Sequence, residues 1–180
     1  LISRPNHRLG NQLLTTPLVQ EVIDAFPNCK IDLFVKGGVA NAVFEHYENI
    51  DKVIQLPKKP FSHIIKYIFK WFALKKRRYD LVINGDKDSS SGKLATQLAK
   101  GKFKLFGDLN EAIQNEYDDY EHISKYPVYN LREYLALIGF PKSNKPVPTL
   151  NIKLSEQELA KGKTVLRESV HNEKPTICIY

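Results

Sequence analysis

The sequence predicts an α/β domain built on a parallel sheet with helices on both of its faces. Short apolar stretches that fit strands alternate along the chain with longer stretches of helical periodicity. These strand stretches are apolar along their whole length, as expected where helices cover both faces of a sheet. The 180 residues and the hydrophobic content of 42% suffice for one domain with a proper core.

The expected strands are short and evenly spread. They lie at 1–4, 30–36, 52–56, 79–84, 102–106 and 176–180, with a further short strand inside 146–154. Residues 107–129 have no periodicity and are expected to form a long loop.

The expected helices lie at 11–26, within 37–47, and at 61–78, 89–100, 130–139 and 155–170. The first follows a loop whose flexible point is Gly10. It is expected to start at Asn11 as its N-cap and to be kinked or weakened at Pro17. Gly139 fits a C-cap, and Ser155 with Glu158 has the spacing of a capping box.

Composition and charge exclude several classes of protein. Two cysteines are too few for a disulfide scaffold or a cysteine-built metal site, and they favour a reduced cytoplasmic compartment. No signal-peptide pattern and no apolar run of about 20 residues is present. The net charge is +7, and segment 58–104 holds 13 basic but only three acidic residues. This segment suggests an anionic partner such as phosphate or anionic lipid, or else a solvated face. No nucleic-acid-binding signature is present, so no nucleic-acid partner is expected.

Ligands of open α/β sheets bind at the carboxyl ends of the strands, which points to three loops here. They are 4–11, 85–93 and 107–129. The first two loops both adjoin predicted helix N-termini. They carry side chains that can bind polyols or phosphates: Asn6, His7, Arg8, Asn11, Asp86, Asp88, Ser89, Ser90, Ser91 and Lys93. Neither loop has the glycine spacing of a dinucleotide fingerprint or a P-loop, which disfavours an NAD enzyme and a P-loop ATPase. His7 is either a general base or a solvent-facing loop residue.

Several ordered motifs resemble glycosyltransferase family 9, which includes the ADP-heptose:lipopolysaccharide heptosyltransferases. Family members open with a strand, a Gly-Asp at a helix start, a Leu-Thr-Pro motif, a Phe/Tyr-Pro and an I-D-L strand. The corresponding residues here are Gly10-Asn11, Leu14-Thr15-Thr16-Pro17, Phe26-Pro27 and Ile31-Asp32-Leu33. Later, the stretches YDLVIN and KFKLFG resemble two further strands of the family. The similarity covers most of residues 1–107 and continues more loosely to the end.

This resemblance implies a GT-B fold, in which two Rossmann-like domains face each other across a cleft. Residues 1–173 would form the N-terminal, acceptor-binding domain. Residues 174–180 would form the linker and first strand of a missing C-terminal domain that binds most of the nucleotide-sugar, such as ADP-heptose. The reaction would be inverting and metal-independent transfer of a sugar to lipopolysaccharide or another surface-glycan acceptor, without a cofactor. The chain as given would not catalyse it alone.

The resemblance also suggests site residues, with one departure. The family has an Asp, thought to be the general base, where this chain has Asn11, and an amide cannot accept the acceptor's proton. The base is therefore relocated to Asp86, Asp88 or His7, or Asn11 only orients the acceptor, or the enzyme is degenerate. A non-catalytic module that binds an anionic glycan or phosphorylated ligand is the alternative function.

The other expected acceptor contacts come from the same loops. Gly10 and Asn11 would position the acceptor, and Arg8 would bind its phosphate or carboxylate. Thr15 and Thr16 would line the cleft or simply pack within the helix. The remaining contacts, for which helix capping is the alternative, are Ser89, Ser90, Ser91 and Lys93.

Helix 61–78 combines aromatic residues with a basic end, KKRR. It would contact the anionic inner face of the cytoplasmic membrane, where lipid-linked acceptors lie. The alternative is an ordinary crossover helix whose aromatic side chains pack on the sheet.

Overall fold

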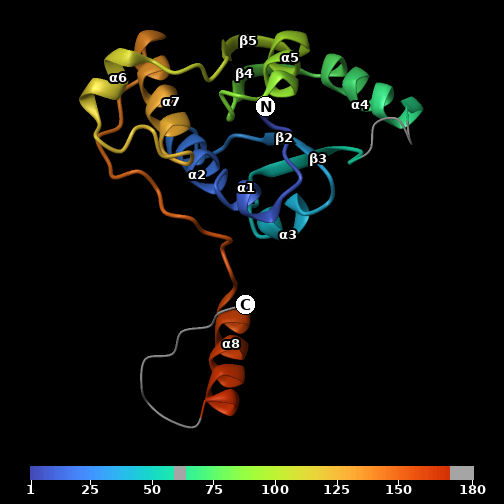
Figure 1. Ribbon diagram of the computed structural model, residues 1–180, viewed down its shortest axis with the longest axis vertical. Helices are drawn as coiled ribbons and strands as arrows, with labels where there is room; N and C mark the ends of the chain where they lie inside the picture. Colours follow the sequence, from blue (N-terminus) through green and yellow to red (C-terminus); the bar gives the residue numbers. More distant parts are fainter. Residues whose placement is uncertain (59–63, 171–180) are drawn as a thin grey trace.

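The computed structural model describes residues 1–58 and 64–170, and its centre is a parallel sheet of five strands (Figure 1). The strands are β1 (Ile2–Arg4), β2 (Ile31–Lys36), β3 (Ile50–Leu56), β4 (Arg78–Asn84) and β5 (Lys100–Leu105). Their order in the sheet is β3-β2-β1-β4-β5. This arrangement, with helices between consecutive strands, confirms the predicted Rossmann-like α/β class.

Helices cover both faces of this sheet. The helices of the described residues are α1 (Leu9–Leu13), α2 (Thr16–Ala25), α3 (Ala40–Phe44), α4 (Ile64–Lys76), α5 (Ser90–Leu98), α6 (Glu111–Glu116), α7 (Tyr126–Leu137) and α8 (Glu156–Ser169), of which α8 does not lie on the sheet (Figure 1). Successive side chains of a strand point to opposite faces, so Leu33 joins the core under α2, α3 and α7, whereas Phe34 joins the core under α4 and α5. Each face therefore has its own buried cluster.

The first predicted helix is divided in two. Arg8 holds the N-cap position of α1, so the prediction of Asn11 as the N-cap is wrong. Gly10 lies inside α1 and has no positive φ, so it is not a flexible point of the loop. Pro17 is the second residue of α2 and has no N–H to donate to the Leu13 carbonyl. The Thr16 hydroxyl donates to that carbonyl instead, at 2.8 Å.

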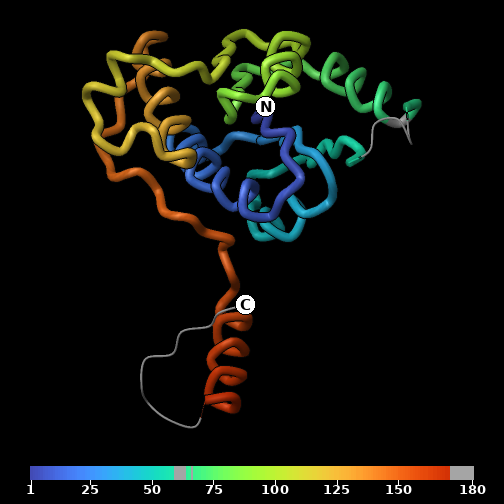
Figure 2. Tube along the Cα trace, in the orientation of Figure 1, coloured from blue at the N-terminus to red at the C-terminus, as the bar shows by residue number. Residues whose placement is uncertain are grey.

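Two other predictions about local structure are wrong. Residues 107–129 contain α6 and the start of α7 rather than one long loop. The Asn110 side chain accepts from the backbone N–H groups of Ala112 and Ile113, which starts a helix too short to show periodicity. Segment 146–154 holds no strand, because it pairs with none of the five strands and runs instead along the domain toward α8, held by hydrogen bonds to Gln20, Tyr47 and Thr16 (Figure 2).

The predicted helix ends are confirmed further along. Gly139 has a φ of +93° just after the C-cap of α7, and Ser155 and Glu158 form a complete capping box at α8. Although α8 falls within the predicted domain 1–173, it stands apart from the sheet and buries none of its residues. The predicted strand 176–180 and the first residues of predicted helix 61–78 lie outside the described residues.

Candidate functional site

The loops after β1 and β4 lie side by side at the middle of the sheet. The chain proceeds from β1 outward to β2 and β3, and then returns to the other side of β1 to form β4 and β5. In the register of β1 and β4, Ser3 is opposite Asn84, and the Gly85 N–H donates to the Ser3 carbonyl at 2.9 Å. Such a switch in strand order opens a crevice at the carboxyl ends of the two strands, where α/β proteins bind ligands.

A buried arginine connects the two loops. Arg4, the last residue of β1, is 1% exposed, and its Nη1 donates to the Gly85 carbonyl. Its Nε and Nη2 are buried and have no acceptor among the described residues. Burial lowers the pKa of the Arg4 guanidinium, while the nearby Asp86 and Tyr126 act in the opposite direction. A positive group therefore lies at this edge of the sheet, where it fixes the start of the loop after β4.

The end of the third predicted loop joins the same place. Tyr126, at the start of α7, donates to the Gly85 carbonyl at 3.3 Å and accepts from the Lys87 N–H at 2.9 Å. The Asn84 side-chain amide donates to the carbonyls of Asp86 and Phe106, at 2.8 Å each. All three segments selected from the sequence thus meet at one edge of the sheet.

The loop after β4 presents two carboxylates beside the start of α5. Asp86 is half-buried, and its Oδ1 accepts from the Asp88 N–H at 3.2 Å, while Asp88 is exposed. Ser89 caps α5 by accepting from the Gly92 N–H at 3.0 Å, and Lys93 pairs with Asp108. Two further predicted contact residues follow in the first turn of α5, with Ser90 exposed and Ser91 half-buried.

The loop after β1 is more open. His7 and Arg8 are exposed, and the Arg8 N–H donates to the Asn6 side chain at 3.1 Å. The Cβ of His7 lies close to Gly37, which follows β2. This part of the loop after β1 therefore lies beside the residues that follow β2.

The residues predicted within the first helix differ in accessibility. Gly10 is exposed and Asn11 is half-buried, both inside α1. Thr15 and Thr16 are buried, and their hydroxyls donate to the carbonyls of Asn11 and Leu13. The Thr16 oxygen also accepts from the Asn151 N–H. These contacts give both threonines a packing role, the alternative that the sequence left open.

Sequence reasoning missed Arg4, Asn84 and Tyr126 as organisers of this edge. Arg4 and Asn84 are polar residues that end two apolar strands, which is a usable signal for a site. Tyr126 lies inside the stretch that was expected to be an irregular loop, and nothing in its local pattern points to β4.

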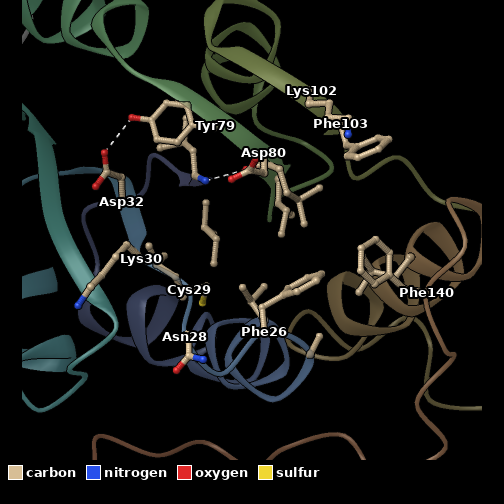
Figure 3. Close-up of a pocket in the computed structure, with 18 of the residues that line it drawn as sticks. Phe26, Asn28, Cys29, Lys30, Asp32, Tyr79, Asp80, Lys102, Phe103 and Phe140 are labelled. Carbon is tan, nitrogen blue, oxygen red and sulfur yellow. Dashed lines mark hydrogen bonds between the residues drawn. The ribbon is translucent and has the colours of Figure 1, made fainter.

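A cavity of about 960 Å³ lies at the opposite edge of the sheet (Figure 3). The ends of α2 and α7 approach it, through Phe26 and Phe140, and Asp32, Tyr79 and Asp80 line its strand side. Four basic residues, Lys30, Arg77, Arg78 and Lys102, also line this cavity, which lies at the amino ends of the strands.

Within residues 1–58 and 64–170, no group of three or more His, Cys, Asp or Glu side chains is placed to hold a metal ion. No helix in the described part of the chain is long and apolar enough to cross a membrane.

Comparisons with known proteins support the fold. No family model matches the sequence, and no curated protein matches it. Among solved structures, the chain is similar to E. coli heptosyltransferase WaaC with ADP, with a TM-score of 0.57 and 22% identity. It is also similar to WaaC with ADP-2-deoxy-2-fluoro heptose, with a TM-score of 0.54 and 18% identity. Each match covers 81% of this chain, which spans about half of the WaaC chain (49% and 50%). At these identities the likeness shows a shared fold.

Proposed function

We propose that this chain is the acceptor-binding, N-terminal half of an inverting, metal-independent GT-B glycosyltransferase. One observation carries the proposal: the loops after β1 and β4 meet at the switch point of a fold shared with half of a heptosyltransferase. The donor in this proposal is a nucleotide-sugar of the ADP-heptose type, held mainly by residues beyond Tyr180. The acceptor is lipopolysaccharide or another surface glycan of a bacterium, reached at the cytoplasmic face of the membrane.

In this reaction an acceptor hydroxyl attacks the anomeric carbon of the donor sugar. The new glycosidic bond forms as the bond to the nucleoside diphosphate breaks, and the diphosphate leaves with the electron pair of that bond. A general base takes the proton of the hydroxyl, which the amide of Asn11 cannot do. We assign this role to Asp86, because its loop is fixed by Arg4, Asn84 and Tyr126. Its Oδ2 has no hydrogen-bond partner among the described residues.

The neighbouring polar groups would hold the acceptor. Arg8 is exposed and offers a planar set of donors for an acceptor phosphate or carboxylate. Asn11 would orient the sugar, and Asp88 and His7 are the other two groups able to accept its proton.

The proposal is tested in the full-length protein by sugar transfer from ADP-, GDP- and UDP-sugars to a glycan acceptor. Asp86→Asn is expected to lower kcat by about 10²–10⁴-fold with little change in the KM of the donor. Asp24→Asn removes an exposed carboxylate near the far end of α2 and should leave kcat unchanged. Full transfer by all of Asp86→Asn, Asp88→Asn and His7→Gln would overturn the relocated base. Absence of transfer from every donor would overturn the glycosyltransferase itself.

The replacement of the family's Asp by Asn11 favours a second function, a non-catalytic module that binds an anionic glycan or a phosphorylated ligand. Calorimetry separates the two functions. The module binds a phosphorylated glycan without turnover, and Arg8→Gln weakens that binding, whereas Asp86→Asn leaves it unchanged.

A further inference from the structure

One side of α4 is covered by the sheet. Tyr67, Trp71 and Leu74 face the core, where Leu74 is fully buried and the Trp71 ring meets the Phe34 ring edge-on, with centroids 5.1 Å apart. These positions repeat at the spacing of one helix face. Tyr67 and Trp71 therefore pack on the sheet, as the aromatic residues of an ordinary crossover helix do.

The other side of α4 is also apolar, but it faces solvent. Ile65 is 70% exposed, Phe69 is 68% exposed and Phe72 is 54% exposed, and Ile64 and Ile68 add to the same surface. Positions 65, 68, 69 and 72 form a continuous stripe at i, i+3, i+4 and i+7. We call this stripe, with Ile64, the outer face of α4. Single exposed apolar residues are normal, whereas a contiguous patch of this kind marks a binding surface.

Basic side chains border the outer face. A groove of about 700 Å³ between α4 and β3 is lined by Lys52, Lys70 and Lys76. The two aspartates that also line the groove, Asp32 and Asp51, are both paired with Arg77, and none of the three lysines forms an ion pair with a described residue. No acidic residue occurs in α4 itself. Helix α4 thus has an apolar stripe beside unpaired positive charge, as interfacial helices that bind anionic membranes do.

We propose that the outer face of α4 docks the protein onto an anionic lipid bilayer. Phe69 and Phe72 enter the boundary between headgroups and acyl chains, and the helix lies parallel to the membrane surface. Lys70 and Lys76 contact lipid phosphates, with their aliphatic stems along the apolar layer. This inference goes beyond the proposed glycosyltransferase function, and vesicle binding is measured without sugar transfer, so each can fail alone.

Co-sedimentation tests the surface with phosphatidylcholine vesicles that contain or lack phosphatidylglycerol. The chain is expected to bind the phosphatidylglycerol vesicles, with binding that weakens as NaCl rises to about 0.5 M. The double variant Phe69→Ser and Phe72→Ser should lower the partition coefficient by more than about tenfold. Lys70→Gln with Lys76→Gln should lower it by about tenfold at low salt and much less at high salt.

Two matched controls come from other helices. Leu137→Ser changes an apolar side chain of α7 that is 83% exposed, and Lys161→Gln with Lys163→Gln removes two exposed charges from α8. Both should bind vesicles as the unchanged chain does, and circular dichroism should show every variant folded. Absence of phosphatidylglycerol-dependent binding would overturn the proposal, as would binding that the α4 changes leave intact. A dimer in sedimentation velocity that Phe69→Ser and Phe72→Ser dissociates would also overturn it, since a second copy would then cover this face.

Discussion

The two helical layers of this protein use apolar residues differently. On one face of the sheet, α2 and α7 pack together and bury a complete ion pair, in which Arg132 donates to both carboxylate oxygens of Glu21 at 2.7 and 2.8 Å. On the other face, α4 buries one side and exposes another that is just as apolar. Next to α4, Arg77 pairs with the buried Asp32 and with the exposed Asp51, but the Arg77 side chain itself is 41% exposed, so this cluster is open to solvent on its arginine side.

This difference separates two purposes of apolar surface. In the layer of α2 and α7, apolar side chains and the enclosed ion pair fix how two helices meet the sheet. In α4, one narrow face suffices to hold the helix, so the outer face is free for a partner.

The largest effect is expected at the buried ion pair. Arg132→Ala leaves the Glu21 carboxylate buried without a partner and should lower the free energy of unfolding by about 3–5 kcal/mol. Replacing both residues, with Glu21→Leu and Arg132→Met, should recover most of this loss, because no charge is then stranded. Urea denaturation followed by circular dichroism measures both values. A cost below about 1 kcal/mol for Arg132→Ala would show that this layer does not depend on the pair.

A smaller contrast is expected within α4. Leu74→Ala opens a cavity under the helix and should cost about 2–5 kcal/mol, toward the lower end if the free outer side lets α4 settle inward. Phe69→Ala, five residues earlier, should change stability by less than about 0.5 kcal/mol. The same urea titrations measure the pair of variants. Equal losses at both positions would mean that the outer face is packed in solution and is not free for a partner.

The sequence predicts the sheet well, because a strand that helices cover on both faces is a short continuous run of apolar residues, and such a run can be recognised locally. Residues 79–84 and 31–36 are of this kind, and both are strands. The separation of α1 from α2 was harder to predict from the sequence. It depends on a hydrogen bond from the Thr16 hydroxyl to the Leu13 carbonyl, which replaces the bond that Pro17 cannot donate. Helix α6 was missed because its stability comes from a cap at Asn110 and from tyrosine packing around Ile113, which are not periodic features.

The candidate site divides in the same way. The sequence identified the three loops, because the carboxyl ends of parallel strands share one edge. It did not identify how they are joined, since the contacts of Arg4 and Tyr126 with Gly85 link residues 81 and 41 positions apart. The burial of Thr15 and Thr16 could not be predicted either. The sequence of a helix with mixed polar and apolar residues does not reveal which distant segment packs against it.

The smallest effect is expected at the exposed pair beside α4. The hydrogen bond from Arg77 lowers the pKa of Asp51 below its ordinary value. A carboxyl group with a lowered folded-state pKa stabilises the fold above its unfolded pKa, near 4, and loses that contribution as the pH falls through the folded value. Asp51→Asn should therefore melt slightly below the unchanged chain at neutral pH, and the difference should vanish on acidification to about pH 3.

Thermal melts by circular dichroism across this range measure the difference, and Asp118→Asn controls for the loss of one exposed carboxylate. Because water and salt screen an exposed pair, added NaCl should also reduce the difference between Asp51→Asn and the unchanged chain at neutral pH. The stability loss caused by Arg132→Ala should not change with salt, because that ion pair is buried. If the Asp51 difference instead matched that of Arg132→Ala and resisted salt, the ion pair beside α4 would carry as much stability as the buried one. The contrast between the two helical layers would then be wrong.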